Sequence, residues 1–126
     1  MPHILFGGRP DLAKLSFSSE IRREGRVVMK IEKSWLRSDG RAVLVEGVVV
    51  EYSRALHPVA VVTLRKEHLS LQFWPPVPLE RNEAVQRWLI MLAEMLQGEG
   101  AGLVIRSNLP PALLKASRLK TAPADE

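Results

Sequence analysis

The side chains best suited to covalent chemistry in this chain lie close together near His57. Glu51 and Ser53 precede it by a few residues, and a serine, a histidine and a carboxylate are the groups that nucleophilic catalysis combines. Ser53 lacks the Gly-x-Ser-x-Gly surroundings of the sharp turn that exposes such a nucleophile. The cluster is more typical of a polar loop, so we predict no catalytic residue and a protein that is not an enzyme.

Metal and cofactor chemistry find little support in the sequence. His3, His57 and His68 stand far apart without a His-x-x-x-His pair, and the chain contains no cysteine, so a zinc set is not predicted. The glycine-rich stretches lack the lysine and the spacing of phosphate-binding loops. We therefore expect no metal and no cofactor.

Basic side chains are the strongest candidates for binding, in a chain whose net charge is +4. Basic side chains can hold phosphates, and Trp35 among them can stack on a base, as in proteins that bind single-stranded nucleic acid. Trp35 shares the alternation of Val27 and Ile31, however, which favours a place in the core. A basic surface that is merely solvated is the alternative. The residues predicted to contact an anion or nucleic acid are Arg22, Arg23, Arg26, Lys30, Arg37 and Arg41, with Lys33 among them in sequence.

A second pattern combines Arg22-x-x-x-Arg26, a Glu-Tyr-Ser tripeptide ending at Ser53, and a strand leading into a long helix. From Arg22 to the end of that helix, the chain resembles a degenerate member of the PilZ family of cyclic-dinucleotide binders. The resemblance implies a barrel in which Arg22, Arg26 and Ser53 contact phosphates and bases. Glu51 stands where the family has Asp or Asn, and Leu56 stands where it has Gly.

The elements that must position these side chains are mainly strands. Alternating apolar and polar residues predict four of them, at 26–35, 43–52, 59–66 and 69–74. The second is apolar on both faces, which is typical of a central strand with a cover on each side. We also expect an edge strand and one helical turn within 1–14, a turn at 22–25 and a loop at 53–58.

A long helix is predicted over residues 80–97, with Glu80 and Glu83 in or near its first turn. Its apolar residues cover roughly 200°, wider than the ~100° stripe that packing on one surface requires. The excess needs a second cover, from the same chain or from another subunit. The residues predicted for self-association are Trp88, Ile90, Met91 and Met95. A short strand at 103–105 and a final helix at 112–119 follow.

These elements predict a single α+β domain over residues 1–120, followed by a frayed tail over 121–126. An antiparallel meander of four to five strands, as an open sheet or a small barrel, is packed by the long helix, with a short C-terminal helix. No apolar run approaches the ~18 residues of a membrane span, so we expect a cytoplasmic protein that does not enter a membrane.

The function predicted from these features is binding rather than catalysis. We expect a non-enzymatic module that self-associates as a homo-oligomer and presents a basic strand face to an anionic partner, nucleic acid among the candidates. The alternative is a small ligand-binding barrel or an enzyme with a pocket between helix and sheet, the PilZ-like binder included.

Overall fold

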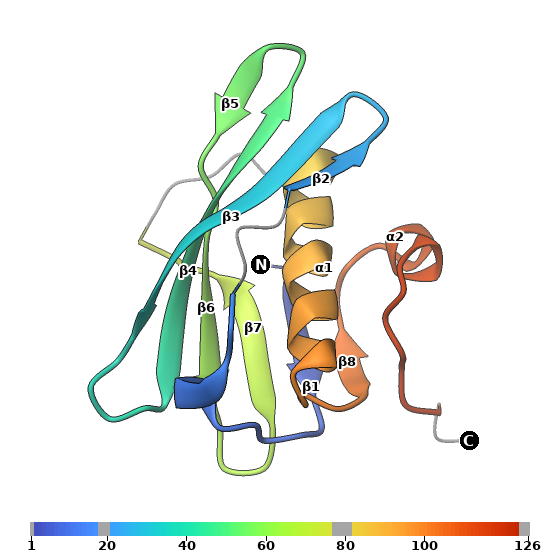
Figure 1. Ribbon diagram of the computed structural model, residues 1–126. Helices are drawn as coiled ribbons and strands as arrows, with labels where there is room; N and C mark the ends of the chain where they lie inside the picture. The colour runs from blue at the N-terminus through green and yellow to red at the C-terminus, as the bar shows by residue number, and fades with distance from the viewer. Residues whose placement is uncertain (1, 18–20, 77–81, 124–126) are drawn as a thin grey trace.

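The computed structural model describes residues 2–17, 21–76 and 82–123, which form an antiparallel sheet curled around a long helix (Figure 1). The helix α1 (Glu83–Gly98) lies against one face of the sheet, and the short helix α2 (Pro111–Ala116) lies on the far side of α1. We call the sheet face toward α1 the inner face and the opposite one the outer face. The strands are β1 (His3–Phe6), β2 (Ile21–Glu24), β3 (Val27–Leu36), β4 (Ala42–Glu51), β5 (Arg54–Leu56), β6 (Val59–Leu64), β7 (Leu69–Phe73) and β8 (Val104–Ser107). The helices are the 3₁₀ turn η1 (Leu12–Lys14), α1 (Glu83–Gly98) and α2 (Pro111–Ala116).

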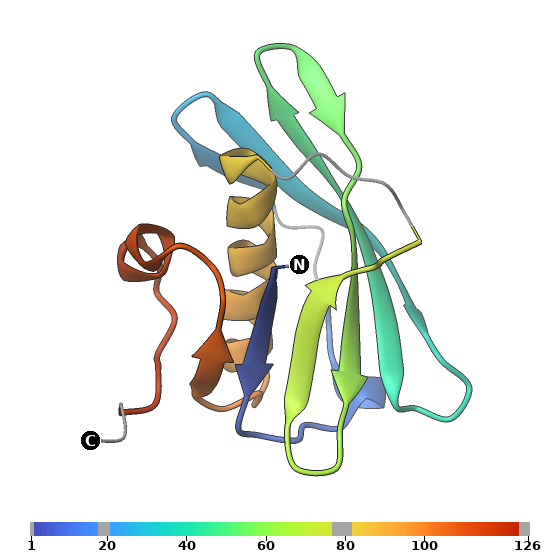
Figure 2. The same cartoon turned by 180° about the vertical axis from the view of Figure 1, so that it is seen from behind.

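The sheet is open, with its strands in the order β2-β3-β4-β6-β7-β1-β8 and β5 paired to β4 beside this path. The predicted α+β class, with an antiparallel sheet, one long helix and a short C-terminal helix, is confirmed. The sheet has eight strands rather than four to five. The N-terminal strand is not an edge strand as expected, because β1 pairs with both β7 and β8 (Figure 2).

Two local predictions fail at turns. Tyr52 and Ser53 adopt positive φ angles of 52° and 63°, which makes a tight turn, and β5 folds back onto β4 where a loop was expected. The expected turn at 22–25 is mostly strand, since β2 runs to Glu24 and Gly25 takes the positive φ. Non-glycine residues seldom adopt such angles. The residue types Tyr52 and Ser53 therefore did not predict a tight turn.

A β-bulge in β3 changes which face its last residues occupy. Ile31 pairs with Gly47 and Lys33 pairs with Glu46, so Glu32 is an extra residue without a register partner in β4. An inserted residue shifts the side-chain alternation by one position. Trp35, opposite Leu44, is therefore on the outer face and 48% exposed. Its predicted place in the core is wrong.

The core lies between the inner face and α1. Trp88 of α1 is completely buried, stacks on Phe73 with ring centroids 6.4 Å apart, and donates its Nε1–H to the Lys30 carbonyl at 3.0 Å. Gly47 lies directly beneath this indole, where a Cβ atom would overlap both Trp88 and the Lys30 carbonyl oxygen. Helix and sheet thus approach at a point where glycine is required.

The start of α1 is capped by Asn82, whose Oδ1 accepts a hydrogen bond from the Val85 N–H at 2.9 Å. α1 begins at Glu83, and residues 80 and 81 of the predicted helix lie outside the described part of the chain.

The C-terminal segment supplies the second cover that the broad apolar arc of α1 needs. Ile90 is only 5% exposed, and it lines a hollow together with Leu113 of α2. Beyond α2, the chain returns along α1 and β8, where Gln97 hydrogen-bonds both backbone groups of Lys120. Thr121 bridges to Val104 and the Ala122 N–H bonds the Val104 carbonyl. Residues 121 and 122 thus pair with β8; residues 124–126 of the tail are not described, and the predicted division at 120 stays a prediction.

Candidate functional site

The outer face of the sheet is the candidate site, because no helix of the described residues lies on it (Figures 1 and 2). One row of side chains crosses four neighbouring strands there: Trp35, Leu44, Val61 and Gln72 are successive register partners. Trp35 is half-exposed, Leu44 and Gln72 are partly buried, and Val61 is nearly buried. The row forms an apolar floor that ends in an exposed indole.

A hollow of about 660 Å³ opens over this row. Trp35 lines it from β3, and Trp74 lines it from the end of β7. Three strand spacings separate β3 from β7, which corresponds to about 14 Å. Arg37 and Arg65 complete the lining, and Pro75 and Pro76 add apolar surface. The hollow therefore offers two aromatic rings, an apolar floor and positive charge, which suits a flat ligand that carries negative charge.

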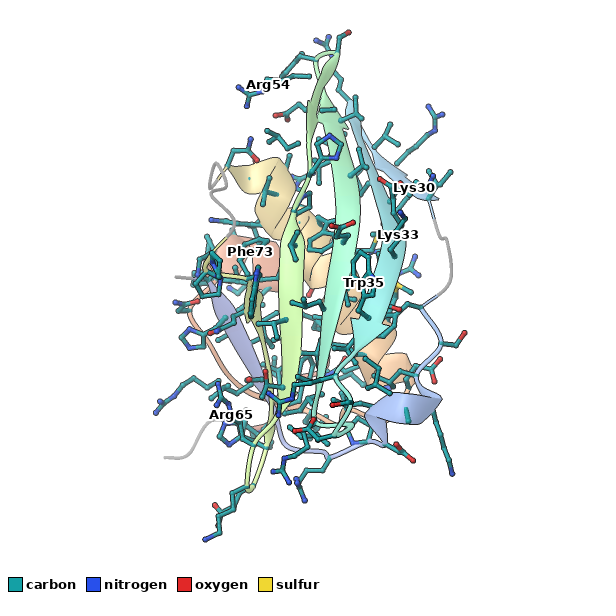
Figure 3. All side chains as sticks on the ribbon, turned by 90° about the vertical axis from the view of Figure 1, so that its left-hand side faces the viewer. Lys30, Lys33, Trp35, Arg54, Arg65 and Phe73 are labelled. Carbon is teal, nitrogen blue, oxygen red and sulfur yellow. The ribbon has the colours of Figure 1, made fainter. Side chains whose placement is uncertain are left out.

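The charged strand positions of the outer face are mostly basic. Among strand residues paired in register, those on this face include one carboxylate, Glu46, and four cations, Arg23, Lys30, Lys33 and Arg106. Figure 3 looks onto this face, with Lys30, Lys33 and Trp35 along β3 and Arg65 toward one end of the sheet. Charges of one sign on a shared surface attract a partner of the opposite sign.

The inner-face strand positions have balanced charges, by contrast. Arg22 and Arg54 share that face with Glu24 and Glu51, by the same register. The Arg22 guanidinium contacts Glu94 of α1 at 2.7 Å, and Glu24 lies 3.7 Å from Arg87. These two contacts join β2 to α1.

The turn between β3 and β4 holds Arg37 beside the hollow. Asp39 accepts hydrogen bonds from Nε and Nη2 of Arg37 at 2.8 and 2.7 Å, and from the Arg41 N–H at 3.0 Å. The side-chain hydrogen bonds from Arg37, then the Arg41 N–H, lower the pKa of Asp39 to about 2. The same pairing raises the pKa of Arg37. The turn thus holds the Arg37 guanidinium in one orientation, paired with the Asp39 carboxylate.

The basic residues predicted to contact an anion are divided among four places. Arg23 and Lys30 lie on the outer face, while Arg22 points inward to Glu94. Arg37 and Arg41 flank the turn after β3, and Arg37 lines the hollow. Arg26 lies at the opposite end of β3 from Arg37, and the ten extended residues between them span about 30 Å.

The residues singled out by the PilZ resemblance are separated as well. Arg26 lies near the Tyr-Ser turn, since its guanidinium carbon is 5.7 Å from the centre of the Tyr52 ring, and Ser53 follows directly. Arg22 faces the helix instead, where Glu94 holds its guanidinium. The sheet is open rather than the barrel that the family implies.

The residues predicted for self-association face the interior of the chain. Trp88 and Met91 are completely buried, Ile90 is nearly so, and Met95 is partly exposed in a hollow beside the C-terminal segment. The apolar arc of α1 is accounted for within one chain, and self-association stays a prediction.

The hollow that Met95 lines has a volume of about 550 Å³ and lies between α1 and the C-terminal segment. Glu94 lines it, and both of its carboxylate oxygens are engaged: Oε1 by Arg22 at 2.7 Å and Oε2 by the Arg118 N–H at 3.0 Å. Because Glu94 joins three segments of the chain, we assign this hollow a structural role.

The described residues include no group of three or more histidines, aspartates and glutamates arranged to hold a metal ion. No described helix has the length and apolar character needed to cross a bilayer.

Among the residues that line the hollow, the sequence identified only Arg37 as a contact residue, and it favoured the core for Trp35. The rest of the lining comes from several strands that lie side by side only because of the strand order. Among these residues are Leu44, Val61, Arg65 and Trp74. The sequence contained one partial indication of the hollow: the strand predicted at 43–52 is apolar on both faces, and the one long helix can cover only one of them. No family model, no curated protein and no solved structure matches this chain.

Proposed function

We propose that this protein is a non-enzymatic binding module that takes an anionic partner on the outer face of its sheet. One observation carries the proposal: half-exposed Trp35 borders a hollow on a face whose paired strand positions include four cations and one carboxylate. Leaving a tryptophan exposed beside an apolar hollow keeps contact area available for a partner. Cations nearby favour a negatively charged one.

The rival function, ligand binding in a pocket between helix and sheet, has less support. The described inner-face positions and α1 share one continuous apolar core that includes Trp88, Leu89 and Leu92. Bulky side chains occupy the space that such a ligand would need.

Charge reversal on the two sides of the molecule tests the proposal. Lys33→Glu changes the outer face, and Lys115→Glu makes the same change in net charge on exposed α2, beyond α1 (Figure 1). We expect binding of heparin, inorganic polyphosphate and oligodeoxythymidylate at low salt, weakened severalfold by Lys33→Glu and little by Lys115→Glu. Absence of binding by all three probes, or equal effects of both variants, would overturn it.

Self-association is a separate proposal that the apolar character of the chain first suggested. Light scattering checks it against the 14.1 kDa mass of one chain.

A further inference from the structure

Building on the proposed function, we infer that the anionic partner is single-stranded nucleic acid, whose bases stack on Trp35 and Trp74 in the outer-face hollow. The cations around the hollow contact its phosphates. DNA and RNA share this chemistry, since both present flat bases on an anionic backbone.

The two indoles provide the stacking surfaces. Trp35 is 48% exposed, and Trp74 is partly exposed on the opposite side of the same hollow. Aromatic side chains on an open sheet accept bases of any sequence, because every base has a π face. Leu44 and Val61 form a floor between them that excludes water from one side of a bound base.

The positions of the cations match a backbone that crosses the strands. Lys33 is two residues before Trp35 on β3, a separation of about 7 Å along an extended strand, and the two lie close together in Figure 3. Arg37 and Arg65 line the hollow itself. A backbone that passes over the hollow can therefore contact cations at both ends while its bases point toward the sheet.

A duplex fits this surface less well than a single strand. Bases within a duplex are already stacked on their neighbours and present only their edges in the grooves. An indole on this face can stack on a base only when that base is free to leave its own stack. The hollow therefore favours single strands, whereas the cations alone attract either form.

Charge also argues against a second copy of this chain on the outer face. Face-to-face packing would bring Lys30, Lys33 and Arg65 of each copy onto a surface with the same positive excess. Like charges that meet across an interface are unfavourable. A polyanion neutralises them instead.

Fluorescence anisotropy with labelled oligodeoxythymidylate, oligouridylate and a DNA duplex of equal length tests the inference, with inorganic polyphosphate as competitor. We expect both single strands to bind more tightly than the duplex. With Lys33, Arg37 and Arg65 contacting phosphates, log K should fall with log salt at a slope of about −2. Trp35→Ala should weaken single-strand binding roughly 5- to 150-fold, and Trp35→Phe should restore part of it.

Tyr52 is the matched control, an aromatic side chain that is more exposed than Trp35 but lies in the β4–β5 turn. Tyr52→Ala should leave single-strand affinity almost unchanged. Circular dichroism spectra of all variants establish that they are folded.

The remaining outcomes separate the inference from the proposed function. If duplex or polyphosphate binds as tightly as the single strands and Trp35→Ala changes nothing, the inference is overturned while anion binding survives. If no probe binds, both are overturned. If the chain is a dimer that Trp35→Ala dissociates without any oligonucleotide binding, the outer face belongs to a second copy and the inference is also overturned.

Discussion

The two faces of this sheet each contact a tryptophan, but in different ways. At the inner face, Trp88 of α1 stacks on Phe73 and donates a hydrogen bond to the Lys30 carbonyl. On the outer face, Trp35 has half of its surface in water beside an open hollow. Burial gives the first tryptophan a structural role, and exposure leaves the second available for a partner.

Charge distinguishes the faces in the same way. Inner-face charges such as Arg22 find partners on α1, whereas the outer face has a positive excess. Ion pairs within a chain join its elements, while unbalanced charge acts at longer range on other molecules. Side-chain type alone therefore does not identify a binding residue, since each face contacts a tryptophan and carries basic side chains.

The largest expected contrast comes from truncating a tryptophan on each face. Trp88→Ala should lower the free energy of unfolding by about 3 to 5 kcal/mol, because it leaves a cavity in the core. Trp35→Ala should lower it by about 1 kcal/mol or less, because half of that side chain is already in water. Urea denaturation of both variants measures the difference, and equal losses would contradict the assignment of roles.

Gly47→Ala tests the close approach of helix and sheet. The added methyl group would meet the Trp88 indole and the Lys30 carbonyl, so the hydrogen bond between them must lengthen or break. We expect a loss of about 2 to 3 kcal/mol, measured by thermal unfolding. Gly98→Ala is the matched control, since a methyl group added there would meet no other part of the described chain within 4 Å. A Gly47→Ala protein as stable as the control would show that helix and sheet are not tightly packed there.

Glu94→Ala tests the charges that join the inner face to the rest of the chain. It removes a partner from Arg22, whose side chain is 23% exposed, and one from the Arg118 N–H. The expected loss of stability is about 1 to 2 kcal/mol. A double-mutant cycle with Arg22→Ala isolates the pair, and its coupling energy should be favourable. Oligonucleotide affinity should change little, because the pair lies on the inner side.

The smallest effect concerns the turn that holds Arg37. The pKa of Asp39 is lowered to about 2 from an ordinary value of 3.8, so its stabilising contribution is present above about pH 4 and is lost as pH falls toward 2. In NMR titrations, Arg37→Gln should raise the Asp39 midpoint toward 3.8. A midpoint that Arg37→Gln leaves unchanged would mean that the pairing is absent in solution.

Residue alternation predicted the strands β3, β4, β6 and β7 and the long helix α1, because one-sided burial imposes a period on the sequence. It could not predict the bulge at Glu32, which is a property of pairing between two strands. That one residue reversed the assignment of Trp35 from core to surface.

The candidate site was predicted only in part for a related reason. Lys30 and Arg37 were recognised as basic residues in a strand region, whereas Trp74 and Arg65 join the hollow through the strand order. Strand order depends on contacts between distant segments, which a local pattern does not report.

The three tryptophans allow one measurement to test the central claim, that the outer face binds and the inner face supports the fold. Each indole N–H gives its own cross-peak in a ¹H–¹⁵N NMR spectrum, and titration with oligodeoxythymidylate follows all three together. We predict that the Trp35 and Trp74 cross-peaks shift, while that of Trp88, bonded to the Lys30 carbonyl, stays in place. A shift of Trp88 with Trp35 and Trp74 unmoved, or no shift of any cross-peak, would contradict the account.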